Sequence, residues 1–68
     1  MIAEQTFNDF LKGVISLNEL HIQLAHESHF GDSLGVYTVS KFKGEYRLFR
    51  DNLMLISGIR ETDREYKQ

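Results

Sequence analysis

The fold is decided by the stretch Leu34–Arg60, LGVYTVSKFKGEYRLFRDNLMLISGIR. Polar and apolar residues alternate along three runs in this stretch, and two short polar breaks, Lys43-Gly44 and Asp51-Asn52, separate the runs. Alternation with a period of two is typical of β-strands, and breaks of two residues are typical of hairpin turns. The stretch therefore predicts a three-stranded antiparallel meander.

Two-residue turns at both breaks set the register of this sheet. They place opposite each other the pairs Val39–Leu48, Leu48–Leu55, Thr38–Phe49 and Phe49–Met54. The face that we assign to the helices is the more continuously apolar one and carries Tyr37, Val39, Tyr46, Leu48, Leu53, Leu55 and Ile59. The second face carries Val36, Thr38, Ser40, Phe42, Arg47, Phe49, Met54, Ile56 and Arg60. A slip of one residue at either break would exchange the two faces.

Helical spacing of apolar residues predicts a short amphipathic helix ahead of the meander. Its inner face follows the i, i+3, i+4, i+7, i+8 pattern and consists of Phe7, Phe10, Leu11, Val14 and Ile15. We expect Thr6 to cap its N-terminus, since a threonine oxygen can accept a backbone N–H of the first turn.

A second helix is predicted to begin at Ser16 and to end near His29. Ser16-Leu17-Asn18-Glu19 matches the capping box, in which the serine and glutamate side chains satisfy backbone N–H groups of the first turn. Its inner stripe is Leu17, Leu20 and Leu24. The sequence therefore predicts an α+β domain of order ααβββ, with a helical hairpin on one face of the meander. Residues 1–68 form this one domain, and we expect residues 61–68 to be a frayed tail or a short helix.

A chain of 68 residues has a thin core, because a domain of this size buries only about 60% of the surface that its unfolded chain exposes. The sequence contains no cysteine, so neither disulfides nor thiolate metal sites can add stability. We therefore expect oligomerisation, most simply as a homodimer. No apolar run reaches the roughly 18 residues of a membrane span and no signal peptide is evident, so we expect a cytoplasmic protein that does not enter a membrane.

Charge is divided unevenly along the chain. Residues 1–33 carry five acidic groups and one lysine, and residues 34–68 carry seven basic and five acidic groups, for a formal net charge of −2. This net charge has the wrong sign for a general nucleic-acid binder. Halves of opposite sign can steer a partner or a second copy; the alternative is an ordinary solvated surface.

The sequence indicates neither metal binding nor catalysis. His21, His26 and His29 project in different directions from an ideal helix, so one ion cannot reach all three unless the helix ends early. Serines lie near His29 and Asp32, but a catalytic triad is recognised by its geometry and not by closeness in sequence. No carboxylate pair, phosphate loop or cofactor fingerprint is present. We expect a non-enzymatic protein without metal or cofactor.

The segment Lys41–Arg50 favours nucleic acid as an alternative ligand. It interleaves four cations with three aromatic residues, as surfaces that bind single-stranded nucleic acid do. Strand alternation divides this set between the two faces. Residues 44–53, GEYRLFRDNL, resemble the wing and following helix of MerR-type and excisionase-like winged domains, which implies DNA binding. No Lys or Arg occurs between Lys12 and Lys41, however, so the second helix lacks the cations of a recognition helix.

The second sheet face is the best functional clue in the sequence. The helices can cover one face only, so the other exposes apolar and aromatic side chains edged by arginines, types that are enriched in protein interfaces. We expect the chain to bind another protein through Val36, Phe42, Arg47, Phe49, Met54, Ile56 and Arg60. The alternative is that the C-terminal tail covers this face as the second half of a small core. The function class that we expect is a small regulator or inhibitor, of the kind that phages and other mobile elements carry.

Overall fold

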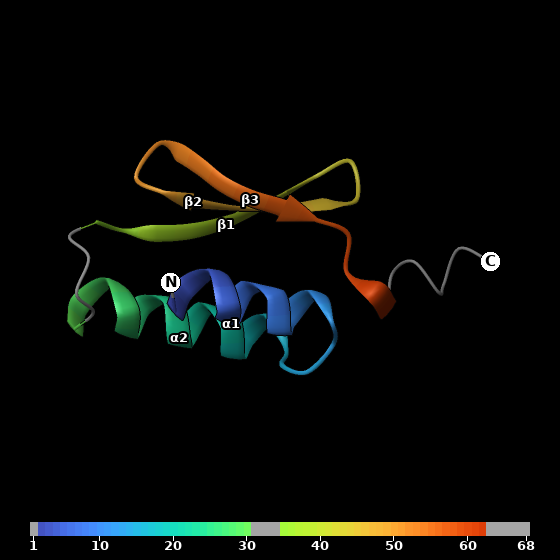
Figure 1. Cartoon of the computed structure of the whole chain (residues 1–68), viewed down its shortest axis with the longest axis horizontal. Coiled ribbons are helices and arrows are strands. Elements are labelled where there is room, and N and C mark those ends of the chain that lie inside the picture. The colour runs from blue at the N-terminus through green and yellow to red at the C-terminus, as the bar shows by residue number, and fades with distance from the viewer. Residues whose placement is uncertain (1, 31–34, 63–68) are drawn as a thin grey trace.

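The computed structural model describes residues 2–30 and 35–62 and has two layers (Figure 1). One layer is a pair of helices, α1 (Ile2–Leu11) and α2 (Leu17–Phe30). The other is an antiparallel sheet in the order β1-β2-β3, formed by β1 (Tyr37–Phe42), β2 (Glu45–Arg50) and β3 (Leu53–Gly58). Both helices lie on the same side of the sheet (Figure 1). The predicted α+β fold of order ααβββ is confirmed.

Helix α1 begins earlier in the chain than the apolar pattern predicted. Thr6 lies inside it, where the Thr6 Oγ1 donates a hydrogen bond to the Ile2 carbonyl oxygen at 3.0 Å. The predicted cap at Thr6 is therefore wrong. The buried face consists of Ala3, Thr6, Phe7 and Phe10, which have the i, i+3, i+4, i+7 spacing of a single helical face.

Helix α1 ends at Leu11 because the chain turns at Gly13. Gly13 has a φ of 85°, in the left-handed region that favours glycine. Its N–H donates to the Phe10 carbonyl at 3.0 Å, and the Val14 N–H donates to the Asp9 carbonyl at 2.9 Å. These two bonds form the Schellman motif that closes many helices. Val14, predicted on the inner face, lies instead in the connection and is 68% exposed.

Helix α2 begins where the capping box predicts, with the serine half of that motif formed, while the Glu19 carboxylate accepts a hydrogen bond from the Gln23 Nε2 at 3.4 Å. The Glu19 N–H donates to the Ser16 Oγ at 3.1 Å, and the Leu20 N–H donates to the Ser16 carbonyl at 2.9 Å. Leu20 and Leu24 are buried, whereas Leu17 is 39% exposed. The helix thus presents a narrow stripe to the core, and most of its other described side chains are exposed.

The first hairpin has the predicted register. Lys43 and Gly44 both have positive φ, 51° and 81°, as a type I′ turn requires. Strands β1 and β2 accordingly pair Val39 with Leu48 and Thr38 with Phe49.

The second hairpin departs from the predicted register after its first pairs. Phe49 pairs with Met54 as predicted, but Leu48 pairs with Ile56 and not with Leu55. A β-bulge at Leu55 adds one residue to β3 and turns the side chains that follow to the opposite face. Ile56 consequently packs against the core together with Leu55, so its predicted place on the second face is wrong.

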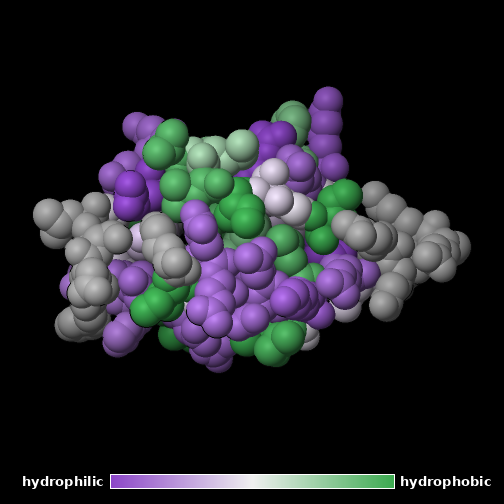
Figure 2. Space-filling view, in the orientation of Figure 1, coloured by the Kyte–Doolittle hydropathy of each residue, from purple (hydrophilic) through white to green (hydrophobic). Residues whose placement is uncertain are grey.

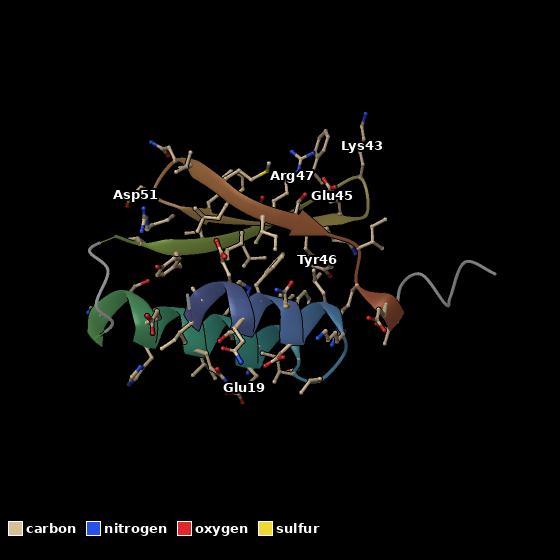
Figure 3. All side chains as sticks on the ribbon, in the orientation of Figure 1. Glu19, Lys43, Glu45, Tyr46, Arg47 and Asp51 are labelled. Carbon is tan, nitrogen blue, oxygen red and sulfur yellow. The ribbon has the colours of Figure 1, made fainter. Side chains whose placement is uncertain are left out.

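The core lies between the two layers. Its buried members are Ala3, Phe7, Phe10, Leu20, Leu24, Tyr37 and Leu48. Tyr46 points from the sheet toward the helices (Figure 3), where its ring meets that of Phe10 edge to face with centroids 4.8 Å apart. Opposite Tyr46 on β3 stands Gly58, at which an added Cβ would lie 2.6 Å from the Leu11 Cδ1. The layers approach closely at this point.

Arg60 lies toward the helices and not on the second face of the sheet. Its Nε donates to the Phe10 carbonyl at 3.0 Å and its Nη2 to the Ile15 carbonyl at 2.9 Å. Its Cζ lies 4.5 Å from the centroid of the Phe10 ring. The guanidinium therefore binds one carbonyl at the C-terminal end of α1, where cations are favoured, and one in the connection to α2. The predicted place of Arg60 on the second face is wrong.

The chain leaves β3 through an exposed segment. Glu61 and Thr62 have helical geometry and are both exposed. The rest of the predicted tail, residues 63–68, lies outside the described residues.

Candidate protein-binding face

The helices cover one side of the sheet, and the opposite side is here called the outer face. No helix or strand within residues 2–30 and 35–62 covers it (Figure 1). Because side chains alternate along each strand, every second residue projects from the outer face, except across the bulge in β3. The outer face consists of Val36, Thr38, Ser40, Phe42, Glu45, Arg47, Phe49, Met54 and Ser57.

Cations surround Phe42 at one end of the outer face. The Arg47 Cζ lies 4.9 Å and the Lys43 Nζ 5.3 Å from the centroid of the Phe42 ring. The Arg47 Nε also donates to the Glu45 Oε1 at 3.0 Å, and these two side chains are 35% and 37% exposed. Lys43, Glu45 and Arg47 point away from the helices (Figure 3). This end of the face thus combines an exposed ring with two cations, one of which is paired with a carboxylate.

Apolar side chains cross the middle of the outer face. Phe49 on β2 stands opposite Thr38 on β1 and Met54 on β3. Phe49 is half-buried by its neighbours on the sheet, whereas Met54 is 50% exposed. Figure 2, which views the two layers from the side, shows hydrophobic residues at the level of the sheet above a hydrophilic band at the level of α1. A partner that removed these side chains from water would gain roughly 25 cal/mol for each Å² of apolar surface.

The structure brings five of the seven predicted partner-binding residues together on the outer face. They are Val36, Phe42, Arg47, Phe49 and Met54. The other two, Ile56 and Arg60, lie on the helical side.

The predicted partner-binding set omitted two charged residues near Phe42, Glu45 and Lys43. Glu45 and Arg47 are two residues apart on one strand, so their alternation already placed them on the same side of the sheet. Lys43 is different, because its side chain reaches Phe42 from a left-handed turn residue that strand alternation does not describe.

The described residues contain no group of three His, Cys, Asp or Glu side chains that could hold a metal ion. The histidines of α2 are all exposed. Asp32 and Ser33 lie outside the described residues, so a triad with His29 has no described geometry. Within the same described part of the chain, no helix has the length and apolar character needed to cross a membrane.

The segment that resembles a DNA-binding wing is not followed by a helix. Residues 44–53 form β2 and the turn into β3, which is a strand. Helix α2 contains no Lys or Arg. The structure therefore lacks, in its described part, the cationic helix that enters the major groove in winged domains.

The outer face can bind a ligand that offers apolar groups to Phe49 and Met54 and hydrogen-bond acceptors to Lys43 and Arg47. Aromatic, methionine and arginine side chains are the types that protein interfaces favour. A comparison of the chain with family models, with curated proteins and with solved structures gave no match.

Proposed function

We propose that the protein is a small regulator or inhibitor that binds another protein through the outer face and catalyses no reaction. The observation that supports this is the set of exposed apolar side chains on the uncovered side of the sheet. Val36 is 57%, Phe42 51% and Met54 50% exposed. Apolar side chains gathered on one exposed face commonly mark an interaction site, because a protein that works alone gains nothing from leaving them in water.

The partner that fits this face presents an apolar patch edged by carboxylates. Phe49 and Met54 would fill the centre of the interface, where energy is concentrated when water is excluded. Lys43 and Arg47 would lie at the rim, where charges mainly affect the rate of association and the choice of partner. The affinity should therefore fall strongly when the apolar centre is substituted and only slightly when the salt concentration rises.

The test is capture of the partner by the immobilised protein from a lysate of the source organism, followed by mass spectrometry. Met54→Glu places a charge in the centre of the outer face and should abolish capture. Ile2→Glu is the matched control, because Ile2 is 64% exposed in the helical layer and a glutamate is well tolerated in a first helical turn. A partner held equally well by both variants would contradict the proposed face.

Single-stranded nucleic acid is the second candidate ligand, and the Lys43–Phe42–Arg47 cluster is the observation that favours it. An exposed ring can stack on a base while neighbouring cations contact phosphates. Affinity for an oligonucleotide would then be measurable at low salt and fall steeply as the salt concentration rises. Absence of binding to single- or double-stranded DNA or RNA at low ionic strength would remove this candidate.

We place the proposed activity in the cytoplasm. The chain has no cysteine, so it gains no stability from an oxidising compartment, where small domains are commonly held by disulfides. Fractionation of cells that express the tagged protein measures this, and recovery in the membrane or secreted fraction would contradict it.

A further inference from the structure

The two outer strands of the sheet differ in the regularity of their free edges. Strand β3 contains the bulge at Leu55, which interrupts the even spacing of its outward-directed backbone groups. Such a bulge blunts an edge against further pairing. Strand β1 pairs with β2 without a shift from Tyr37 to Phe42, and no strand among the described residues pairs with its other edge. The outer edge of β1 is therefore the more regular of the two.

The hydrogen bonds at the start of β1 show which backbone groups face this edge. The Asp51 N–H donates to the Val36 carbonyl at 2.8 Å. In an antiparallel ladder Val36 and every second residue after it then direct their backbone groups toward β2, while Tyr37, Val39 and Lys41 direct theirs to the other edge. The Tyr37 N–H is not open to a further strand, because it donates to the Ser28 Oγ of α2 at 3.0 Å. Val39, in the middle of β1, directs both its N–H and its C=O outward.

Strand β1 is self-complementary about Val39. Residues at equal distances on its two sides match in character: Thr38 and Ser40 both carry hydroxyl groups, and Val36 and Phe42 both carry exposed apolar side chains. A second copy in antiparallel orientation, related by a two-fold axis at Val39, therefore pairs hydroxyl with hydroxyl and apolar with apolar.

The surface of α2 beside this edge contains no Asp, Glu, Lys or Arg. Ser28 marks the side of α2 that reaches the edge. At about 100° per residue, the exposed residues on that side are Asn18, His21, Ile22, Ala25 and His29. The two glutamates of α2, Glu19 and Glu27, project from the rest of the helix. Depletion of charged residues is typical of interface centres, and the small side chain of Ala25 allows a second helix to approach closely.

We propose that β1 pairs with β1 of a second copy, antiparallel about Val39, so that two three-stranded sheets become one continuous sheet. The Val39 residues of the two copies exchange N–H···O=C bonds. On the outer face, Val36 of each copy packs on Phe42 of the other, and the two α2 helices lie beside each other beneath the joint. Lys41 falls opposite Tyr37 of the second copy, so no two like charges meet across it.

This homodimer does not depend on the proposed function, since it forms from the chain alone. It would bring two outer faces side by side in one sheet. A partner with two matching sites would then gain from avidity without any new contact.

A charge swap at Val36 and Phe42 tests the pairing through the mass of the purified full chain. Light scattering after size-exclusion chromatography at micromolar concentration should give about twice the 8.0 kDa of one chain. Val36→Glu with Phe42→Glu sets carboxylates opposite each other and should reduce the mass to that of one chain. Val36→Glu with Phe42→Lys sets opposite charges there and should restore the dimer. Circular dichroism of both variants checks that the fold is retained.

Cysteine pairing tests the register, because the chain has no cysteine of its own. Thr38→Cys and Ser40→Cys, purified separately and then mixed, should form a disulfide-linked heterodimer on mild oxidation, since cross-strand neighbours bring their Cβ atoms close together. Gln5→Cys, exposed on α1, should not link to either. A wild-type mass of one chain at every concentration, or a dimer that the two glutamates leave intact, would overturn the proposal.

Discussion

Replacing Arg60 by leucine should destabilise the fold although Arg60 is not part of the hydrophobic core. Its guanidinium donates to the Phe10 and Ile15 carbonyls at 3.0 and 2.9 Å and lies over the Phe10 ring. Hydrogen bonds to charged groups each contribute about 1.5–3 kcal/mol, and a stacked cation adds up to about 1 kcal/mol. The Phe10 carbonyl keeps the Gly13 N–H as a donor, and Arg60 is only half-buried. The remaining donor to the Phe10 carbonyl and the partial exposure of Arg60 both reduce the expected loss, so the free energy of unfolding should fall by about 2–3 kcal/mol.

Urea and thermal unfolding followed by circular dichroism measure this loss, which corresponds to a fall of roughly 10–20 °C in Tm for a domain of this size. Arg47→Leu is the matched control, because Arg47 also lies over a phenylalanine ring but in an exposed ion pair, worth at most about 1 kcal/mol. Arg60→Lys keeps the charge without the two-pronged donor and should be intermediate. Equal losses for Arg60→Leu and Arg47→Leu would refute the structural role of Arg60.

Three further predictions concern the core, a cap and a turn. Leu48→Ala should lower the free energy of unfolding by about 2–5 kcal/mol, because Leu48 is fully buried. Met54→Ala should lower stability clearly less in thermal melts and should weaken partner capture instead. The reverse order of stabilities would mean that the outer face is the buried one. Ser16→Ala should cost about 0.5–2 kcal/mol in urea unfolding, since it removes the acceptor of the Glu19 N–H, and an unchanged stability would contradict the cap. Gly13→Ala should cost about 1 kcal/mol or more, because the φ of 85° strains any other residue.

One helix start could be predicted from sequence and the other could not, for a physical reason. Ser16 and Glu19 are both parts of one local motif, so the capping interaction needs nothing from the rest of the chain. Thr6 precedes apolar residues just as Ser16 does, but helix α1 begins before Thr6 and its buried face already includes Ala3. A small side chain adds little to an apolar pattern, and only its burial under the sheet shows that it belongs to the helix.

The outer face could be predicted from the sequence on the strands β1 and β2, where the local turn sets the register. The Lys43-Gly44 turn closes with two residues, so alternation placed Phe42, Arg47 and Phe49 together. Beyond the bulge, the register depends on packing between the layers. Without the extra residue, Ser57 would stand opposite Tyr46, in the place where a Cβ would lie 2.6 Å from a Leu11 side-chain carbon. The bulge puts Gly58 opposite Tyr46. No local pattern in β3 indicates that a residue without a side chain is needed at this position.

The same bulge limits what the outer face can offer a partner. Ile56 points inward, so the described apolar side chains of the outer face form two groups. Phe49 and Met54 are a central pair, and Val36 and Phe42 are an edge pair. In the proposed homodimer the edge pair is buried between the two copies, so the central pairs are left for a foreign partner. Three strand spacings of about 4.8 Å separate the two β2 strands across the joint, which sets them about 14 Å apart. A partner that contacts both would bind the two-glutamate monomer more weakly than the dimer, whereas a partner that uses one central pair would bind each chain with equal affinity.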